Sequence, residues 1–212
     1  PRRVVIATAT LALQDQLVDD DLPHVADVAA DGGTPLRVGV LKGRSNYLCL
    51  ARADEQAGSL FQDDRSLAES LVKAAARRRD GQRASLPTTD DEAWRRLSVT
   101  SDECPGSAKC SRGGDCWAEW ARREAERCRV LVVNQALYAA HLLSGEVVLP
   151  GHDAVIIDEA HALADTMVNA ASVSVSPARL RAVERLAARW TSTDVAEALS
   201  SAADGLADAL DG

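Results

Sequence analysis

Short runs of apolar residues recur along the chain between clusters of polar and turn-forming residues. Runs of roughly four to eight residues that are rich in Val and Ile are typical of β-strands. These runs predict strands over residues 3–8, 36–41, 129–133 and 154–157. The last of them is apolar throughout, so we expect it in the middle of a parallel sheet that is covered on both faces.

Apolar residues at helical spacing separate these strands. The first predicted helix follows Thr10, which can cap it, runs from Leu11 to about Val18, and ends at Leu22-Pro23. Clusters of Gly, Pro, Ser, Thr and Asp predict loops over residues 80–91 and 98–115. The other predicted helices cover residues 46–57, 66–79, 90–97, 116–129, 135–143, 177–190 and 193–210.

The order of these elements indicates an α/β fold. Predicted strands flank a mainly helical stretch that contains every cysteine of the chain. This organisation predicts a nucleotide-type core of parallel strands that is interrupted by a second, smaller domain.

The composition fits a protein with a buried core. The chain has 212 residues, of which 46% are hydrophobic, and its one Phe, two Tyr and four Trp leave Ala, Val and Leu to build the core. The sequence has neither an apolar run of about 18 residues nor a signal peptide. We therefore expect a cytoplasmic protein without a membrane partner. In that compartment, five cysteines are expected to be free, catalytic or metal-bound.

Charge is distributed unevenly along the chain. The 24 basic and 32 acidic residues give a net charge of −8, yet residues 37–129 hold 18 basic and 15 acidic residues. An acidic protein can still bind a phosphate backbone through a locally basic surface, because the electrostatic field near the site determines binding more than the net charge does. The alternative interpretation is that these charges lie on solvated helix faces.

An acidic motif follows the last apolar strand, in Ile156-Ile157-Asp158-Glu159-Ala160-His161. Open α/β sheets bind their ligands at the carboxyl ends of strands. Asp158 is a candidate Mg²⁺ ligand, and Glu159 a candidate base for the water that attacks a γ-phosphate. His161 would couple the site to its neighbours. The alternative is a helix N-terminus, where acidic residues are favoured anyway.

Four cysteines form a candidate metal site. Cys104, Cys110 and Cys116 have the spacing C-x5-C-x5-C, with five residues between successive cysteines, and Cys49 precedes them. Four thiolates can hold a [4Fe–4S] cluster or a tetrahedral zinc ion. The closely paired cysteines typical of zinc sites are missing, which favours iron–sulfur, and unligated cysteines are the alternative. Cys128 is interpreted as an ordinary thiol at the start of a strand.

Four segments resemble motifs of one helicase family, in that family's order. Residues 7–17 resemble motif Ia of the DinG branch, and residues 42–49 (KGRSNYLC) resemble the K-G-R-x-N-Y-x-C signature of iron–sulfur helicases of the XPD/DinG group. Residues 132–137 resemble the V-N-H-x-L stretch, with Gln135 in place of the common His. Asp158-Glu159-Ala160-His161 resembles the Walker B box of superfamily 2 helicases.

The resemblance implies an ATP-dependent helicase that moves 5′ to 3′ on single-stranded DNA, opens forked or structured DNA and acts as a monomer. It implies that the four cysteines hold a [4Fe–4S] cluster, with ATP and Mg²⁺ as further cofactors. The residues expected at the DNA are Thr8, Thr10, Gln14, Lys42, Arg44 and Tyr47. For Thr10, capping of the helix is an equally good interpretation, and Tyr47 can pack inside the protein in place of stacking on a base.

The resemblance also implies a domain division. Residues 1–36 and 130–165 would form part of a RecA-like motor domain, and residues 37–129 the iron–sulfur domain inserted into it. Residues 166–212 match no motif and would, by position, begin a helical arch domain.

The phosphate-binding loop G-x-x-x-x-G-K-[ST] does not occur in the sequence. Helicases of this type place it just before the strand at residues 3–8, so we expect a fragment that is inactive alone. The alternative is a non-catalytic, metal-stapled nucleic-acid-binding module with a decayed motor core. A third possibility is a helicase that is fused to an upstream nuclease.

Overall fold

The computed structural model describes residues 3–28, 36–58, 62–87, 90–172, 180, 183–184 and 193–211. The chain divides into two compact units, residues 1–170 and residues 171–212, and each is described by itself.

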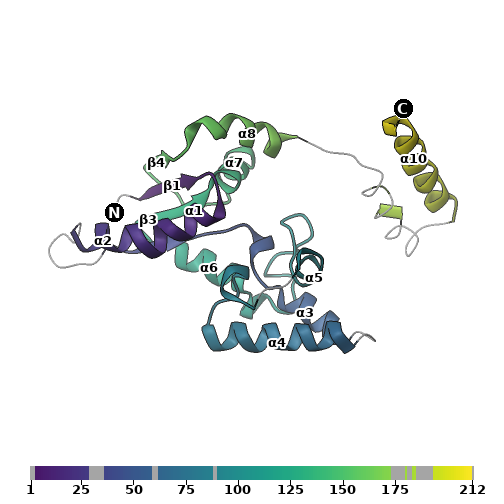
Figure 1. Cartoon of the computed structure of the whole chain (residues 1–212), viewed down its shortest axis with the longest axis horizontal. Coiled ribbons are helices and arrows are strands. Elements are labelled where there is room, and N and C mark those ends of the chain that lie inside the picture. Colours follow the sequence, from purple (N-terminus) through teal and green to yellow (C-terminus); the bar gives the residue numbers. More distant parts are fainter. Residues whose placement is uncertain are drawn as a thin grey trace. The chain divides into compact units, whose positions relative to one another are not determined.

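A four-stranded parallel sheet forms the centre of the first unit (Figure 1). Its strands are β1 (Val4–Thr8), β2 (Val38–Val40), β3 (Val130–Asn134) and β4 (Ala154–Ile157), in the order β2-β3-β1-β4. The predicted strands and the parallel α/β core are therefore confirmed. Because all neighbours are parallel, the ends of β1, β3 and β4 meet at one edge of the sheet, with Thr8 opposite Asn134 and Ala7 opposite Ile157.

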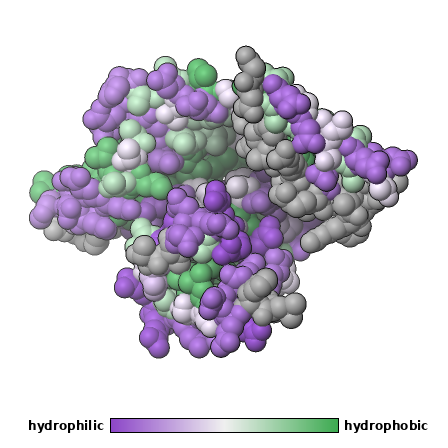
Figure 2. Space-filling view, turned by 45° about the vertical axis from the view of Figure 1, so that its right-hand side comes forward, coloured by the Kyte–Doolittle hydropathy of each residue, from purple (hydrophilic) through white to green (hydrophobic). Residues whose placement is uncertain are grey.

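The prediction that β4 lies in the middle of the sheet is wrong. Within the described residues β4 pairs with β1 alone, so it is the edge strand, and Ile156 is 55% exposed. An apolar sequence indicates that a strand prefers to be covered, but it carries no information on which neighbours are present. Figure 2 shows further apolar areas, in green, on a largely hydrophilic face.

The predicted end of the first helix at Leu22-Pro23 is also wrong. Helix α1 (Leu11–Gln16) continues through a π-helical segment, η1 (Leu17–Asp21), into α2 (Leu22–Val28). The amide of Leu22 donates to the carbonyl of Leu17, five residues back, which widens the turn. Pro23 is the second residue of α2 and directly follows this widened turn.

The segment between β2 and β3 is mainly helical. Asp90 caps α5, because its carboxylate accepts the N–H of Ala93 at 2.7 Å. The predicted helices are confirmed with shifted ends: α3 begins four residues later and α4 four residues earlier than expected. The elements are η2 (Arg44–Asn46), α3 (Leu50–Ala57), α4 (Gln62–Arg78), η3 (Arg83–Ser85), α5 (Asp91–Leu97), η4 (Gly113–Asp115) and α6 (Trp117–Ala125).

Two hydrophobic clusters form the interior of the helical segment and of the sheet. The helical cluster joins α3, α4 and α5 around Leu48, Leu71, Trp94 and Leu97. The sheet cluster contains β1 and β3 residues and three alanines of α6. Helix α6 therefore packs on the sheet, and in Figure 1 it lies between the sheet and α4. Within residues 37–129, β2 thus pairs with β3 in the sheet, and α6 packs against the sheet.

After β3, helices precede and follow the edge strand β4 in the sequence. Asn134 caps α7 (Gln135–Leu143) by accepting the N–H of Leu137 at 2.9 Å, and β4 is followed by η5 (Ala160–Ala162) and α8 (Leu163–Ala171). In the second unit, α10 (Thr193–Asp211) confirms the last predicted helix. The helix predicted over 177–190 falls largely outside the described residues. No helix in the described part of the chain is both long and apolar enough to span a membrane.

Candidate nucleotide site and cysteine-lined cavity

The acidic box lies at the carboxyl edge of the parallel sheet. Asp158 directly follows β4, and its amide donates to the carbonyl of Ala7 in β1 at 2.9 Å. The sheet hydrogen bonds thus continue one residue past the strand, so the first carboxylate of the box has a defined place. Asp158, Glu159 and His161 are all exposed, and they are available to a ligand at this edge.

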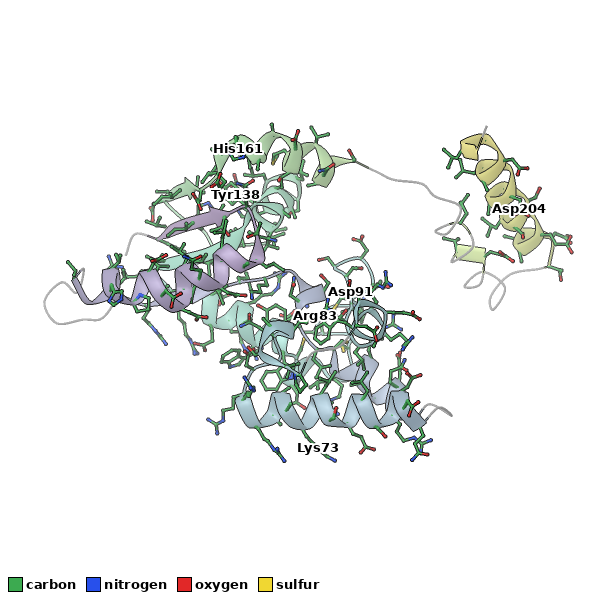
Figure 3. The ribbon with its side chains drawn as sticks, in the orientation of Figure 1. Lys73, Arg83, Asp91, Tyr138, His161 and Asp204 are labelled. Atoms are coloured by element: carbon green, nitrogen blue, oxygen red, sulfur yellow. The ribbon has the colours of Figure 1, made fainter. Side chains whose placement is uncertain are left out.

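Glu159 has an unusual backbone conformation. Its φ is 50° and its ψ is 47°, in the left-handed region that a residue with a side chain enters at a cost. The Glu159 amide donates to the Asp158 carboxylate at 3.0 Å, and its own carboxylate lies 3.2 Å from Nδ1 of His161. The structure therefore brings the three predicted catalytic side chains together. Figure 3 shows His161 on the segment between β4 and α8.

Three predicted DNA-contacting residues lie at the end of β1 or in α1. Thr8 is buried, and its hydroxyl donates to the carbonyl of Thr10 at 3.1 Å. Thr10 is exposed and caps α1 by accepting the N–H of Leu13 at 3.2 Å. Gln14 is fully buried, and its amide donates to the carbonyls of Leu41 and Val132. Of these three, Thr10 alone has its side chain at the surface.

The other three predicted DNA contacts lie where the sheet joins the helical segment. The Lys42 ammonium is buried and pairs with Asp15, and Arg44 pairs with Glu119 of α6. Tyr47 is 3% exposed, and its hydroxyl accepts the N–H of Lys42 at 3.2 Å. Burial raises the pKa of Tyr47 to about 12. In this structure the Tyr47 ring packs inside the protein and has no free face for a base.

All four predicted ligand cysteines line one cavity of about 430 Å³. Cys49 precedes α3, Cys116 precedes α6, and Cys104 and Cys110 come from the loop between α5 and η4. None of them forms a disulfide, and all are partly exposed. Residues up to 67 positions apart in the sequence thus meet around a single space.

The electrostatics of the cavity connect the cysteines with Arg44, which also lines it. Burial raises the pKa of the Cys49 thiol, backbone N–H groups oppose this shift, and negative charge on Cys110 and Cys116 adds to it. Burial would lower the pKa of Arg44, but its bond to Glu119 and the nearby Cys104 and Cys116 raise it overall. Bringing all four thiols into the thiolate form would therefore require a compensating positive charge.

The four cysteines line one cavity, but they are not arranged as a metal-binding group among the described residues. In the described part of the chain, no group of three or more His, Cys, Asp or Glu side chains is placed to hold a metal ion. A tetrahedral zinc site needs its sulfurs within about 4 Å of one another, given Zn–S bonds of about 2.3 Å. Binding of a zinc ion would therefore require the cysteines to rearrange, and the same holds for any other metal group.

Two glycines in the cysteine loop give a matched test of its packing. A Cβ on Gly113 would lie 2.0 Å from the carbonyl oxygen of Ser107, whereas one on Gly114 meets nothing within 4 Å. We expect Gly113→Ala to lower the free energy of unfolding by about 1–3 kcal/mol, and Gly114→Ala to change it by less than about 0.5 kcal/mol. Urea unfolding of both variants measures this difference. Equal stabilities would contradict the close packing of the loop.

Cys128 lies apart from the cavity. It is buried against β2, where a Cβ on Gly39 would lie 2.5 Å from its sulfur, and its thiol donates to the carbonyl of Glu124 at 3.3 Å. Burial raises the pKa of this thiol. Its environment is that of a packed, protonated side chain.

One residue near the acidic box had no role assigned from the sequence. Gln135, the first residue of α7, is fully buried and donates to the carbonyls of Asp158 at 2.7 Å and Glu159 at 3.2 Å. Its position in V-N-Q-A-L is the only signal in the sequence, and that signal does not reveal the contact.

A parallel sheet with an acidic box at its carboxyl edge is typical of α/β nucleotide-binding domains. No family model matches the chain. The chain is 35% identical over 226 aligned residues to the ATP-dependent helicase DinG of Mycobacterium tuberculosis, which covers 98% of this chain and 34% of that protein. It is 37% identical to the ATP-dependent DNA helicase YoaA of Escherichia coli, over 77% of this chain and 27% of that protein.

A third relative is the ATP-dependent DNA helicase DinG of Salmonella choleraesuis, 32% identical over 82% of this chain and 26% of that protein. The resemblance to the DinG branch is therefore confirmed, and the chain is a relative of a segment of DinG-type helicases. The chain spans about a third of the length of the first curated relatives that it matches.

Proposed function

We propose that this chain is the part of an ATP-dependent DNA helicase that joins its first motor domain to an iron–sulfur insert. The observation that carries the proposal is the acidic box at the carboxyl edge of a parallel sheet, in a chain similar over 98% of its length to a protein named as an ATP-dependent helicase. The exposed edge of β4 supports it as well, because an apolar parallel strand is expected to be covered by a neighbouring element.

At the nucleotide site, Asp158 would hold Mg²⁺ directly or through water, since a hard cation prefers oxygen ligands. Glu159 would orient and deprotonate the water that attacks the γ-phosphate. His161, whose Nδ1 lies 3.2 Å from the Glu159 carboxylate, would hold that carboxylate in place. The 212 residues contain no phosphate-binding loop, so we expect no ATP hydrolysis from them alone.

We assign the four cysteines around the cavity to a [4Fe–4S] cluster, because the resemblance implies this group and a cubane takes four thiolate ligands. In a cubane each thiolate binds a different iron, so the sulfurs stand farther apart than around zinc. Cys49, Cys104, Cys110 and Cys116 would be the ligands, and the cluster would supply the positive charge that the crowded thiolates require. Its main effect on this chain would be to hold three segments together, namely α3, α6 and the loop that precedes η4.

For DNA, we propose a single-stranded substrate, 5′ to 3′ movement and opening of forked DNA, all on the strength of the resemblance. Thr10 at the start of α1 is the most accessible phosphate contact. Lys42 and Arg44 would bind phosphate by exchanging their present carboxylate partners, Asp15 and Glu119. Thr8, Gln14 and Tyr47 would act by supporting this surface from inside.

The same proposal covers the organisation of the chain. Residues 1–36 and 130–165 would belong to a RecA-like motor domain, residues 37–129 to the cluster domain, and residues 166–212 to the start of an arch domain. A cytoplasmic monomer is the expected form. A non-catalytic binding module with a decayed motor core is the second candidate, and ATP hydrolysis by the protein that contains this chain would rule it out.

Metal analysis tests the cluster part of the proposal. We expect the chain, purified without oxygen, to hold about four irons and four acid-labile sulfides, with a broad absorbance near ~400 nm. Cys128 is not a ligand in this scheme, so blocking it should leave the iron in place. One zinc without iron would overturn the iron–sulfur assignment and leave the cysteine-lined insert. A folded chain without any metal would overturn both metal assignments.

A further inference from the structure

Gln135 is buried directly beneath the acidic box. Its side chain is 0% exposed, and its amide reaches the carbonyls of two consecutive residues, Asp158 at 2.7 Å and Glu159 at 3.2 Å. Both contacts are made to the backbone, so they act on the path of the chain through the box and do not involve either carboxylate. Gln135 itself is fixed at the first turn of α7, directly after the cap residue Asn134.

The chemistry of the side chain fixes its orientation. The amide nitrogen of glutamine has two N–H donors, whereas its oxygen only accepts. Two carbonyl oxygens can be satisfied by the nitrogen, and turning the amide over would place three oxygens together. Among the described residues, Oε1 of Gln135 has no hydrogen-bond partner, so the two donor bonds are what hold the side chain in this orientation.

The backbone that Gln135 contacts is strained. Glu159 has a φ of 50°, which a residue with a Cβ adopts only when its surroundings impose it. The carbonyls on either side of this φ and ψ pair, those of Asp158 and Glu159, are the two that Gln135 binds. One side chain therefore clamps both peptide groups that define the left-handed turn.

We propose that Gln135 is a positioning residue that holds Glu159 in its left-handed conformation and so aims the Glu159 carboxylate at the nucleotide site. The catalytic consequence of this role rests on the proposed function. The structural part does not, because Gln135 binds the two carbonyls of the turn whether or not ATP is hydrolysed. Gln135 touches no reacting atom and acts through Glu159.

The variant that tests the clamp is Gln135→Leu. Leucine is similar in size and removes a buried oxygen that has no partner, so this change by itself is expected to be tolerated. The carbonyl of Glu159 keeps the N–H of Ala162 as a partner, at 2.9 Å, while the carbonyl of Asp158 loses the donor that Gln135 supplies. In the 212-residue chain, we expect amide hydrogen exchange at residues 158–162 to speed up at least about tenfold, with exchange in β1 and β3 unchanged.

Gln14→Leu is the matched control for exchange. Gln14 is also fully buried, also donates to two backbone carbonyls and also has an unpartnered Oε1 among the described residues. It contacts Leu41 and Val132 and not the acidic box. We expect its substitution to leave exchange at residues 158–162 as in the unchanged chain. Equal acceleration by both substitutions would indicate general loosening of the core and would overturn the proposal.

Kinetics test the catalytic part in the protein that contains this chain. A positioning role predicts that Gln135→Leu lowers kcat for ATP hydrolysis about 10- to 100-fold, while KM for ATP stays within about twofold, because binding groups are unaffected. Gln135→His retains one ring N–H and is expected to recover part of kcat. An unchanged kcat in a protein that hydrolyses ATP would overturn the proposal.

The two readouts separate this proposal from the proposed function. If the unchanged protein does not hydrolyse ATP, the helicase proposal fails, and the clamp is judged by exchange alone. Unchanged exchange at residues 158–162 in Gln135→Leu overturns the clamp, whatever the activity of the protein.

Discussion

Cys110→Ser is expected to remove the iron from the chain and to unfold the helical segment between β2 and β3. Serine cannot supply the thiolate that Cys110 contributes to the cavity. The loop that carries Cys104 and Cys110 has little regular structure of its own, so the cluster is what would hold it against α3 and α6. In such domains the free energy of metal binding contributes directly to folding. We therefore expect the free energy of unfolding to fall by about 5 kcal/mol or more.

Iron analysis, visible absorbance and urea unfolding of the anaerobically purified chain measure this effect. Cys128→Ser is the matched control, because it makes the same chemical change at a buried cysteine away from the cavity. It should keep its iron and lose far less stability. A Cys110→Ser chain that folds normally with full iron content would remove Cys110 from the ligand set.

Glu159→Gln is expected to abolish ATP turnover in the protein that contains this chain, while ATP still binds. Glutamine keeps the size of the side chain but cannot accept a proton from the attacking water. General-base catalysis contributes about 10²- to 10⁴-fold, so we expect kcat to fall about a thousandfold. The Kd for ATP should stay within about twofold, because Mg²⁺ and phosphate contacts are assigned to other groups.

Steady-state ATP hydrolysis and equilibrium ATP binding separate the two effects. Glu146→Gln is the control, because Glu146 is an exposed glutamate that also has a positive φ, of 63°, yet lies between α7 and β4. It should leave turnover unchanged. Undiminished turnover in Glu159→Gln would falsify the role of this carboxylate as the base.

The sequence predicted which segments form strands and helices better than it predicted which of them lie side by side. Apolar runs identified all four strands of the sheet, because burial selects for Val and Ile wherever a strand lies. They did not show that β4 is at the edge, since strand order depends on contacts between distant residues. Likewise, Pro23 wrongly indicated the end of the helix, because a π-helical turn carries the helix past it.

Parts of the candidate site were also accessible from the sequence. The spacing of the cysteines indicated that they would meet, and the structure places all four around one cavity. The contacts of Gln14, Lys42 and Tyr47 were not accessible, because motifs show residue types and not their direction. The role of Gln135 was hidden for the same reason, since its partners are backbone carbonyls, which leave no signature in sequence.

The order of strands in the sheet has a consequence for biosynthesis. Strand β1 is made first, but its partners β3 and β4 begin at Val130 and Ala154, so its hydrogen bonds cannot form until those segments have left the ribosome. Cys49, Cys104, Cys110 and Cys116 are all translated before β3. Contacts between such distant segments form slowly. If the proposed cluster is present, the helical segment would have time to take it up before β1 pairs with β3 and β4, and iron supply during translation would then influence how much protein folds.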